Sequence, residues 1–199
     1  KSTLHPEKIL VASAPSEKAF VGKSLKEIAE RAGLSAEQAI LEILKLNRLN
    51  VTIFGRTISG RNLIRAATFQ NSIVSTDGAG YNLDFIRWGD LAHPRSFGAL
   101  PRFLNLISKK STLKLSEAIK KITSLPARAI GLESRGVIAK NKIADIVIFD
   151  PFLQDKASYL HPYVYADGIK FVIVSGFLAV EDEKISVKQN GRVLIKKQT

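Results

Sequence analysis

The sequence predicts an α/β protein whose C-terminal third is a small all-β region. Residues 51–76 alternate in the order strand, helix, strand, which is the unit of a parallel sheet with both faces covered. Amphipathic helices lie on both sides of this unit. After Gly131, short apolar runs separated by turn residues replace the helices. Together these observations predict an α/β front part followed by strands.

Apolar spacing and capping residues predict where the helices lie. Ser24 with Glu27, and Ser35 with Gln38, have the spacing of capping boxes. Gly33 is a typical residue for a helix end. The expected helices cover residues 25–33, 36–47, 60–69, 100–108 and 116–123, with a further short turn at 126.

The expected strands are apolar runs of strand length. They cover residues 8–11, 51–54, 72–75, 136–139, 144–150, 170–175, 178–181 and 192–195. Gly176 and Asp182 supply turns between the later strands.

Residues 77–98 are expected to be a long polar and aromatic loop, which contains Tyr81, Trp88, His93 and Arg95. Loops of this length inside a compact domain are usually functional. Asp77 opens the loop directly after an apolar run. Taken by itself, an Asp–Gly pair after a strand is a common turn sequence and indicates no catalytic role.

Composition excludes several classes of protein. The 199 residues are 45% hydrophobic and 24% charged, as in a folded globular domain. No apolar run reaches the ~18 residues that a membrane span needs. Without Cys there is no disulfide framework and no thiolate metal site. The three His are far apart and offer no local metal-ligand spacing.

The formal net charge is +12, which leaves a basic, non-catalytic binding module as an alternative. The basic residues occur as scattered pairs, and no zinc-finger or RNP motif accompanies them. We therefore expect no nucleic-acid partner. The alternative predicts an affinity for DNA or RNA that falls steeply with salt.

Several motifs in one order resemble the C-terminal passage of the amidohydrolase superfamily. Two further motifs narrow the resemblance: residues 74–78 (VSTDG) resemble the end of the last barrel strand, and residues 93–104 (HPRSFGALPRFL) resemble the HPR segment of the N-acyl-D-amino-acid deacylases, or D-aminoacylases. The other matching motifs are GKSLKEIA (22–29), LSEAI (115–119), TSLPA (123–127), GL (131–132), GVI (136–138), ADIVIFD (144–150) and IVSG (173–176). Asn141 falls where the family usually has Gly in a turn, so the resemblance implies a positive φ at this residue, which Asn adopts more readily than most residues with a side chain.

The resemblance implies the last strand–helix units of a (β/α)8 (TIM) barrel over residues 1–130, followed by part of a small β-sandwich over residues 131–199. A complete barrel needs ~250 residues. We therefore expect this chain to be the C-terminal portion of a longer polypeptide. Below, "parent polypeptide" means the complete natural polypeptide that contains residues 1–199.

The activity that the resemblance implies is zinc-dependent hydrolysis of N-acyl-D-amino acids to a carboxylate and a free D-amino acid. The family's zinc ligands would come from the N-terminal part, so no metal ligand is expected in this chain, which alone should be inactive. The expected partners are a small-molecule N-acyl amino acid and the remaining N-terminal part of the same enzyme. No membrane partner is expected, and the expected location is the cytoplasm.

Four residues are candidates for the site. By the resemblance, Asp77 would lie next to the metal and act as catalytic proton acceptor and donor. Arg95 would bind the substrate carboxylate through its planar fork, or else pin its own loop. His93 is a further candidate for substrate binding, with a buried structural histidine as the alternative. Tyr81 would line an acyl pocket, or anchor the loop.

Related amidohydrolases share the C-terminal motifs and are the second alternative. They include enzymes similar to cyclic amidases, dihydroorotases and dipeptidases. The HPR segment at residues 93–95 favours the deacylases.

Overall fold

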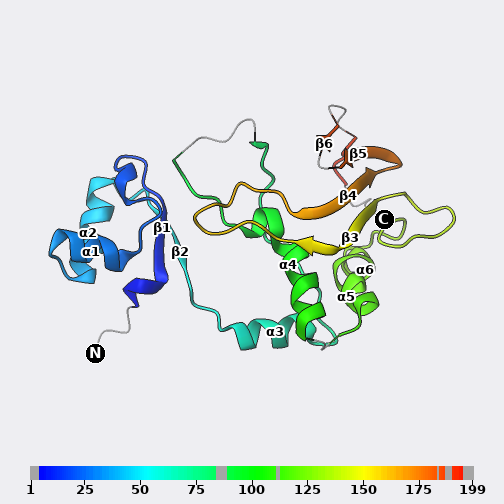
Figure 1. Ribbon diagram of the computed structural model, residues 1–199, viewed down its shortest axis with the longest axis horizontal. Coiled ribbons are helices and arrows are strands. Elements are labelled where there is room, and N and C mark those ends of the chain that lie inside the picture. Colours follow the sequence, from blue (N-terminus) through cyan, green and yellow to red (C-terminus); the bar gives the residue numbers. More distant parts are fainter. Residues whose placement is uncertain (1–4, 84–88, 111–112, 183, 187–189, 195–199) are drawn as a thin grey trace. The chain divides into compact units, whose positions relative to one another are not determined.

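In the computed structural model the described residues are 5–83, 89–110, 113–182, 184–186 and 190–194 (Figure 1). They divide into two compact units. Unit 1 contains residues 1–60, 77–97 and 157–164, and unit 2 contains residues 61–76, 98–156 and 165–199. Trp88 lies outside the described residues. None of the helices in the described part of the chain is long and apolar enough to cross a membrane.

Unit 1 combines a two-stranded antiparallel sheet with two helices. The strands are β1 (Ile9–Ser13) and β2 (Thr52–Gly55), with Leu10 opposite Phe54. The helices are α1 (Leu25–Ala32) and α2 (Ala36–Leu46), and the short 3-10 turns are η1 (Pro6–Lys8) and η2 (Lys18–Phe20).

Both predicted capping boxes are confirmed. The Ser24 hydroxyl accepts a hydrogen bond from the Glu27 main-chain N–H, and Ser35 accepts one from Gln38 in the same way. The Glu27 and Gln38 side chains in turn accept from the main chain of the cap residues. Gly33 ends α1 in the left-handed conformation, with φ 65°. Local side-chain chemistry therefore fixes these two helix starts.

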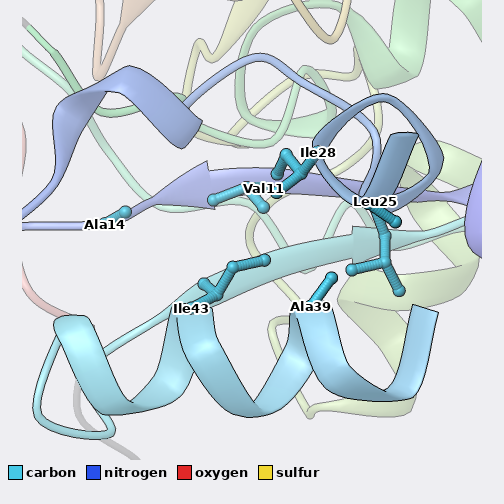
Figure 2. Packing of buried hydrophobic residues seen from close by; sticks show 7 residues of the cluster. Val11, Ala14, Leu25, Ile28, Ala39 and Ile43 are labelled. Atoms are coloured by element: carbon cyan, nitrogen blue, oxygen red, sulfur yellow. The ribbon is translucent and has the colours of Figure 1, made fainter. Parts of the chain in front are cut away.

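The core of unit 1 lies between β1 and the two helices (Figure 2). Its buried side chains are Val11, Ala14, Leu25, Ile28, Ala29, Ala39 and Ile43. In α2 the spacing of Ala39 and Ile43 turns one face of the helix inward. Leu46, the last residue of α2, is 45% exposed.

Unit 2 contains helices and a four-stranded antiparallel sheet with the order β3-β4-β5-β6. Its core is built on Phe103, Leu104, Ile107, Ala118 and Leu153. The strands are β3 (Ile146–Gln154), β4 (Asp167–Val174), β5 (Phe177–Glu181) and β6 (Lys184–Ile185). The helices are α3 (Gly60–Thr68), α4 (Arg95–Lys110), α5 (Leu115–Ile122) and α6 (Ser124–Ala129). The first residue of α3 and the first three residues of α4 belong to unit 1.

Two predicted turns are confirmed. Ser175 and Gly176 have φ values of 52° and 84° and connect β4 to β5, so that Val174 faces Phe177. Positive φ at both central residues is the geometry of a type I′ hairpin turn. Asn141 has φ 65°, as expected for its place in a turn.

The predicted parallel strand–helix–strand unit over residues 51–76 is wrong in this structure. β2 pairs with β1 in the antiparallel direction, and residues 72–75 carry no strand. The main-chain N–H of Val74 donates instead to the carbonyl of Lys121, at 3.1 Å. The expectation that both faces of this unit are covered also fails at β2, because Ile53 is 51% exposed.

Two further predicted strands are absent from the described residues. Residues 136 and 137 lie in a bend at Gly136, which has φ 80°, and residues 138 and 139 carry no strand. A Cβ at Gly136 would lie 2.8 Å from the Ala127 side chain, so the turn packs closely on α6. Residues 192–194 carry no strand, and residue 195 lies outside the described residues. The predicted boundary between the barrel portion and the β-sandwich portion, between residues 130 and 131, stays a prediction.

Candidate active site

The two motifs that carry most of the predicted chemistry meet in unit 1. Asp77 Oδ2 lies 2.9 Å from Arg95 Nη2. The Asp77 side chain is 85% exposed, and its backbone has φ 48°. Asp is one of the few residues with a side chain that adopt this left-handed conformation readily. The turn at the end of the 74–78 motif therefore presents a carboxylate to solvent beside a guanidinium.

A close main-chain approach supports this pair. A Cβ at Gly78 would lie 2.8 Å from Ser96 Cα, so only glycine fits without a shift. The next residue, Ala79, donates its main-chain N–H to Ser96 Oγ at 3.2 Å. The turn after Asp77 therefore packs against the first turn of α4.

His93 lies at the start of α4 and takes part in forming it. Its Nδ1 accepts a hydrogen bond from the Arg95 main-chain N–H at 3.1 Å, and its carbonyl accepts from Ser96. A neutral imidazole that accepts at Nδ1 carries its proton on Nε2. The ring makes edge contacts with Phe54 and Tyr159, at centroid distances of 5.1 and 5.2 Å.

These contacts explain why α4 begins at Arg95 and not near residue 100, as predicted. His93 satisfies main-chain donors that the first helical turn leaves without a partner in the helix. Pro94 follows it and is buried. His is not among the usual N-cap residues, so the cap is not recognisable from the sequence, and Pro94, a residue favoured at the first helical position, is the local signal for this helix start. Substrate binding by His93 stays a prediction.

Tyr81 belongs to an aromatic cluster. Its ring stacks on Phe97 with a centroid distance of 5.4 Å and an angle of 24° between the ring planes. Tyr163 meets the Tyr81 and Phe97 rings edge-on, at 6.2 and 5.8 Å. These contacts fix Tyr81 as part of the loop's packing, and its role in an acyl pocket stays a prediction.

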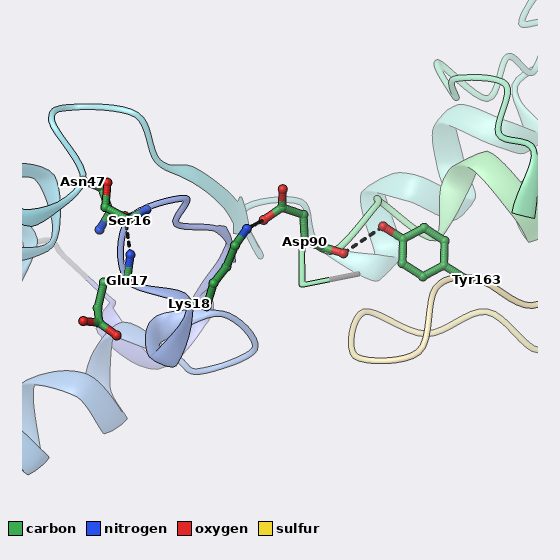
Figure 3. A network of polar contacts seen from close by, with 6 residues as sticks. All are labelled: Ser16, Glu17, Lys18, Asn47, Asp90 and Tyr163. Carbon is green, nitrogen blue, oxygen red and sulfur yellow. Dashed lines mark hydrogen bonds and ion pairs between the residues drawn. The ribbon is translucent and has the colours of Figure 1, made fainter. Parts of the chain in front are cut away.

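Asp90 connects the site-bearing segment to the rest of unit 1 (Figure 3). Its Oδ1 lies 2.7 Å from Lys18 Nζ, and its carbonyl accepts a hydrogen bond from the Tyr163 hydroxyl at 2.8 Å. Partial burial would raise the pKa of Asp90, but hydrogen bonds from Lys18 and Ser13 hold it below the ordinary value of 3.8. Burial raises the pKa of Tyr163, which keeps its hydroxyl a donor.

Asn47 holds the loop that precedes Lys18 in the chain (Figure 3). It is almost fully buried at the end of α2. Its Oδ1 accepts from the main-chain N–H groups of Ser16 and Glu17, at 3.0 and 3.1 Å, and its Nδ2 donates to the carbonyl of Ile43. Sequence patterns do not indicate Asn47 or Asp90, because their partners are distant in the chain.

A cavity of about 300 Å³ lies next to β1 and β2 within unit 1. Phe54 and Tyr159, the two aromatic neighbours of His93, contribute to its wall, together with Glu27 and Arg56. Asp77, Arg95 and Tyr81 are not among its lining residues.

The described residues do not form a metal site by themselves. Among them there is no group of three or more His, Cys, Asp or Glu side chains that could hold a metal ion. Asp77 pairs with the cationic side chain of Arg95. The side chains present in the described part of the chain therefore do not fit a bound zinc ion.

Comparison with known proteins agrees with the resemblance that the sequence motifs carry. The model of the Amidohydrolase family matches residues 22–180. The D-aminoacylase of Alcaligenes xylosoxydans xylosoxydans is 28% identical over 175 residues, which cover 87% of this chain. The resemblance stated from the motifs is confirmed.

Two solved structures are similar to this chain. A D-aminoacylase structure, described for the functional role of its binuclear metal center, matches 94% of the chain with a TM-score of 0.81 and 28% identity. The N-acyl-D-glutamate deacylase of Bordetella bronchiseptica, solved with zinc and a phosphonate inhibitor, matches 87% with a TM-score of 0.71 and 27% identity. These likenesses imply a TIM-barrel-type fold.

The chain spans about a third of the length of the curated relatives it matches, namely 34% of the Alcaligenes D-aminoacylase. It covers 38% of the D-aminoacylase structure and 34% of the deacylase structure. The match therefore describes one portion of those proteins.

Proposed function

The chain belongs to the amidohydrolase family, and from this premise we propose that its parent polypeptide hydrolyses the amide bond of N-acyl-D-amino acids. The observation that carries the proposal is the contact between Asp77 and Arg95 at 2.9 Å. It joins a carboxylate suited to proton transfer with a cation suited to a carboxylate substrate. The deacylases with which the chain is similar support the choice of substrate.

In the proposed reaction, Asp77 accepts a proton from the water that attacks the amide carbon. The C–N bond then breaks, and Asp77 returns the proton to the departing amine. The products are a carboxylate and a free D-amino acid. The exposed position of Asp77 leaves room for substrate and water beside its carboxylate.

Arg95 is proposed to have two tasks. One of its N–H groups contacts Asp77 and orients that carboxylate. A guanidinium has five N–H donors in a planar fork, so others can bind the carboxylate of the amino-acid substrate. His93 would then act mainly on Arg95, by fixing the main chain at the start of α4.

We propose zinc as the metal of the parent polypeptide, held by residues outside this chain. The binuclear metal center of one similar structure and the zinc of another support this proposal. We also propose that the remaining N-terminal part of the enzyme is the partner of residues 1–199. In this proposal residues 1–130 are part of the barrel, and residues 131–199 are part of the β-sandwich. Several large apolar side chains are exposed in the described residues, among them Leu63, Ile73 and Val147. Exposed apolar surface of this kind supports the proposal of a packing partner.

The test is an assay of the purified parent polypeptide, whose intact mass is measured first. The substrate panel contains N-acetyl-D-amino acids, their L enantiomers, a hydantoin, dihydroorotate and a dipeptide. The proposal predicts turnover of the D-amino-acid derivatives and stoichiometric zinc. Turnover of the cyclic amides or the dipeptide alone would favour the related amidohydrolases.

The isolated 199-residue chain is the matched control. It is expected to bind no stoichiometric zinc and to release no amino acid. Zinc binding with turnover by this chain alone would overturn the proposal that the metal ligands lie outside it.

A further inference from the structure

The cavity beside β1 and β2 in unit 1 carries charges that the proposed reaction does not use. Its volume of about 300 Å³ is at the lower end for sites that bind small organic molecules. Two cations, Lys8 and Arg56, and two carboxylates, Glu7 and Glu27, contribute to its wall. The wall therefore presents both signs of charge in equal number.

The two cations lie next to each other at one end of the two-stranded sheet. Ile9 is opposite Gly55, and the Arg56 main-chain N–H donates to the Lys8 carbonyl at 2.9 Å. Neither cationic side chain forms an ion pair within the described part of the chain. Like charges opposite each other on paired chains are destabilising. This end of the cavity is suited to a carboxylate, which a guanidinium binds through two parallel N–H groups.

The two carboxylates are suited to a ligand of the opposite charge. Glu27 Oε2 accepts from the Ser24 main-chain N–H and hydroxyl, both at 2.7 Å, and these bonds lower the pKa of Glu27 from its ordinary value of 4.5. Glu7 Oε1 lies 3.5 Å from His5 Nδ1. Each carboxylate keeps a second oxygen that bonds to no other described residue. A primary ammonium has three N–H donors for such oxygens.

Phe54 and Tyr159 supply the aromatic part of the wall. Their ring centroids are 5.6 Å apart, with an angle of 53° between the ring planes. Tyr159 is 42% exposed, so its ring is not fully used in packing within unit 1. Aromatic rings pair favourably in offset or edge-to-face arrangements. The cavity thus combines aromatic surface with charges of both signs.

We propose that this cavity is a second binding site, which takes a free α-amino acid with an aromatic side chain in its zwitterionic form. The cationic pair binds the carboxylate, the two glutamates bind the ammonium, and the aromatic rings contact the side chain. Asp77 and Arg95 are not among the lining residues, so the site is separate from the proposed catalytic residues. The proposal therefore does not depend on the proposed reaction.

The first experiment titrates D- and L-phenylalanine separately into the 199-residue chain and follows the main-chain amides by NMR. At least one enantiomer is expected to give saturable shifts at residues 8–10, 22–27, 54–56 and 159–160. Three compounds of the same hand are the controls. N-acetylphenylalanine lacks the ammonium, phenylalaninamide lacks the carboxylate and alanine lacks the ring, and each should bind about fivefold more weakly.

Two results of this titration would overturn the proposal. One is the absence of saturable shifts at the lining residues with both enantiomers. The other is equal affinity for phenylalanine and either of its two derivatives, because the site would then not recognise the zwitterion.

The second experiment removes one charge of each sign. Arg56→Gln should weaken phenylalanine binding about tenfold, the scale of a hydrogen bond to a charged group. Glu7→Gln should weaken it about threefold, as for an exposed ion pair. Glu27 is left unchanged, because it also caps α1. Arg48→Gln and Glu42→Gln change exposed residues outside the lining and are the matched controls. Equal affinity in the lining variants and their controls would overturn the assignment.

The third experiment repeats the phenylalanine titration with the parent polypeptide. The same affinity and the same order of variants are expected. Binding by the 199-residue chain alone would mean that the rest of the polypeptide covers the cavity, and would overturn the site. Absence of hydrolysis by the parent would refute the proposed function but not this binding site, which the titrations test by themselves.

Discussion

Arg95 Nη2 lies 2.9 Å from Asp77 Oδ2, so the guanidinium predicted to bind substrate also contacts the carboxylate predicted to transfer protons. In the sequence the two roles belong to separate motifs. Their contact couples them, because any change in Arg95 alters the orientation of Asp77 as well as the proposed site for the substrate carboxylate.

Replacing Asp77 by Asn should abolish most of the activity of the parent polypeptide without unfolding it. We expect kcat to fall by about 10²- to 10⁴-fold, the usual contribution of a general acid–base group. The melting temperature should change little, because the side chain is 85% exposed. Steady-state kinetics and thermal unfolding check both expectations. Retention of full kcat would remove Asp77 from the mechanism.

Replacing Arg95 by Lys should keep the positive charge but lose the planar fork. We expect KM for an N-acetyl-D-amino acid to rise about tenfold or more, because an ammonium cannot form the two parallel hydrogen bonds that a guanidinium makes to a carboxylate. The matched control substrate is the corresponding D-amino acid amide, which has no carboxylate. An equal rise in KM for both substrates would contradict carboxylate binding by Arg95.

Replacing Gly78 by Ala should destabilise the contact between the Asp77 turn and α4. The new Cβ would lie 2.8 Å from Ser96 Cα, and such overpacking costs about 1–3 kcal/mol. Gly80→Ala is the control, because a Cβ at Gly80 would meet no atom within 4 Å. Urea unfolding of both variants measures the difference. Equal stability of the two would show that the close approach does not constrain the turn.

Replacing Asn47 by Ala should loosen the loop that carries Lys18. The change removes the acceptor of the Ser16 and Glu17 N–H groups, whose hydrogen bonds are partly buried, at a cost of about 0.5–1.5 kcal/mol for each bond lost. Amide exchange at residues 16 and 17 should accelerate. Asn50→Ala, at an exposed position, should leave both amides as they are. Unchanged exchange in the Asn47 variant would contradict the account.

The ion pair between Lys18 and Asp90 predicts an acid-sensitive unit 1. Because the folded-state pKa of Asp90 is lowered from 3.8, its stabilising contribution is present above about pH 3.8 and is lost as pH falls through the lower folded-state value. The pair is about half exposed, so the contribution should be under ~1 kcal/mol. Asp90→Asn should be slightly less stable at neutral pH. Its unfolding free energy should also vary less below pH 3.8, and an unchanged pH profile would speak against the pair.

The features predicted best from the sequence are those decided by neighbours in the chain. Ser24 and Ser35 cap their helices through residues three positions later. These interactions need no distant partner. They are therefore visible as spacing in the sequence.

The failed predictions concern features that need a distant partner. The apolar run at residues 72–75 has strand composition, yet Val74 bonds to a helix carbonyl and no strand forms. Lys121 has the sequence context of an exposed lysine, and its burial depends on oxygens of the distant Phe69 and Ser72. In the site, the motifs of Asp77 and Arg95 are both recognisable in the sequence, but their contact arises only from the fold.

The most direct test of the central claim is the release of free amino acid from N-acetyl-D- and N-acetyl-L-amino acids by the parent polypeptide, with Asp77→Asn measured in parallel. The account predicts release from the D enantiomer, little from the L enantiomer, and a loss of about 10²-fold or more in the variant. Equal rates for both enantiomers, or a variant as active as the unchanged protein, would contradict it.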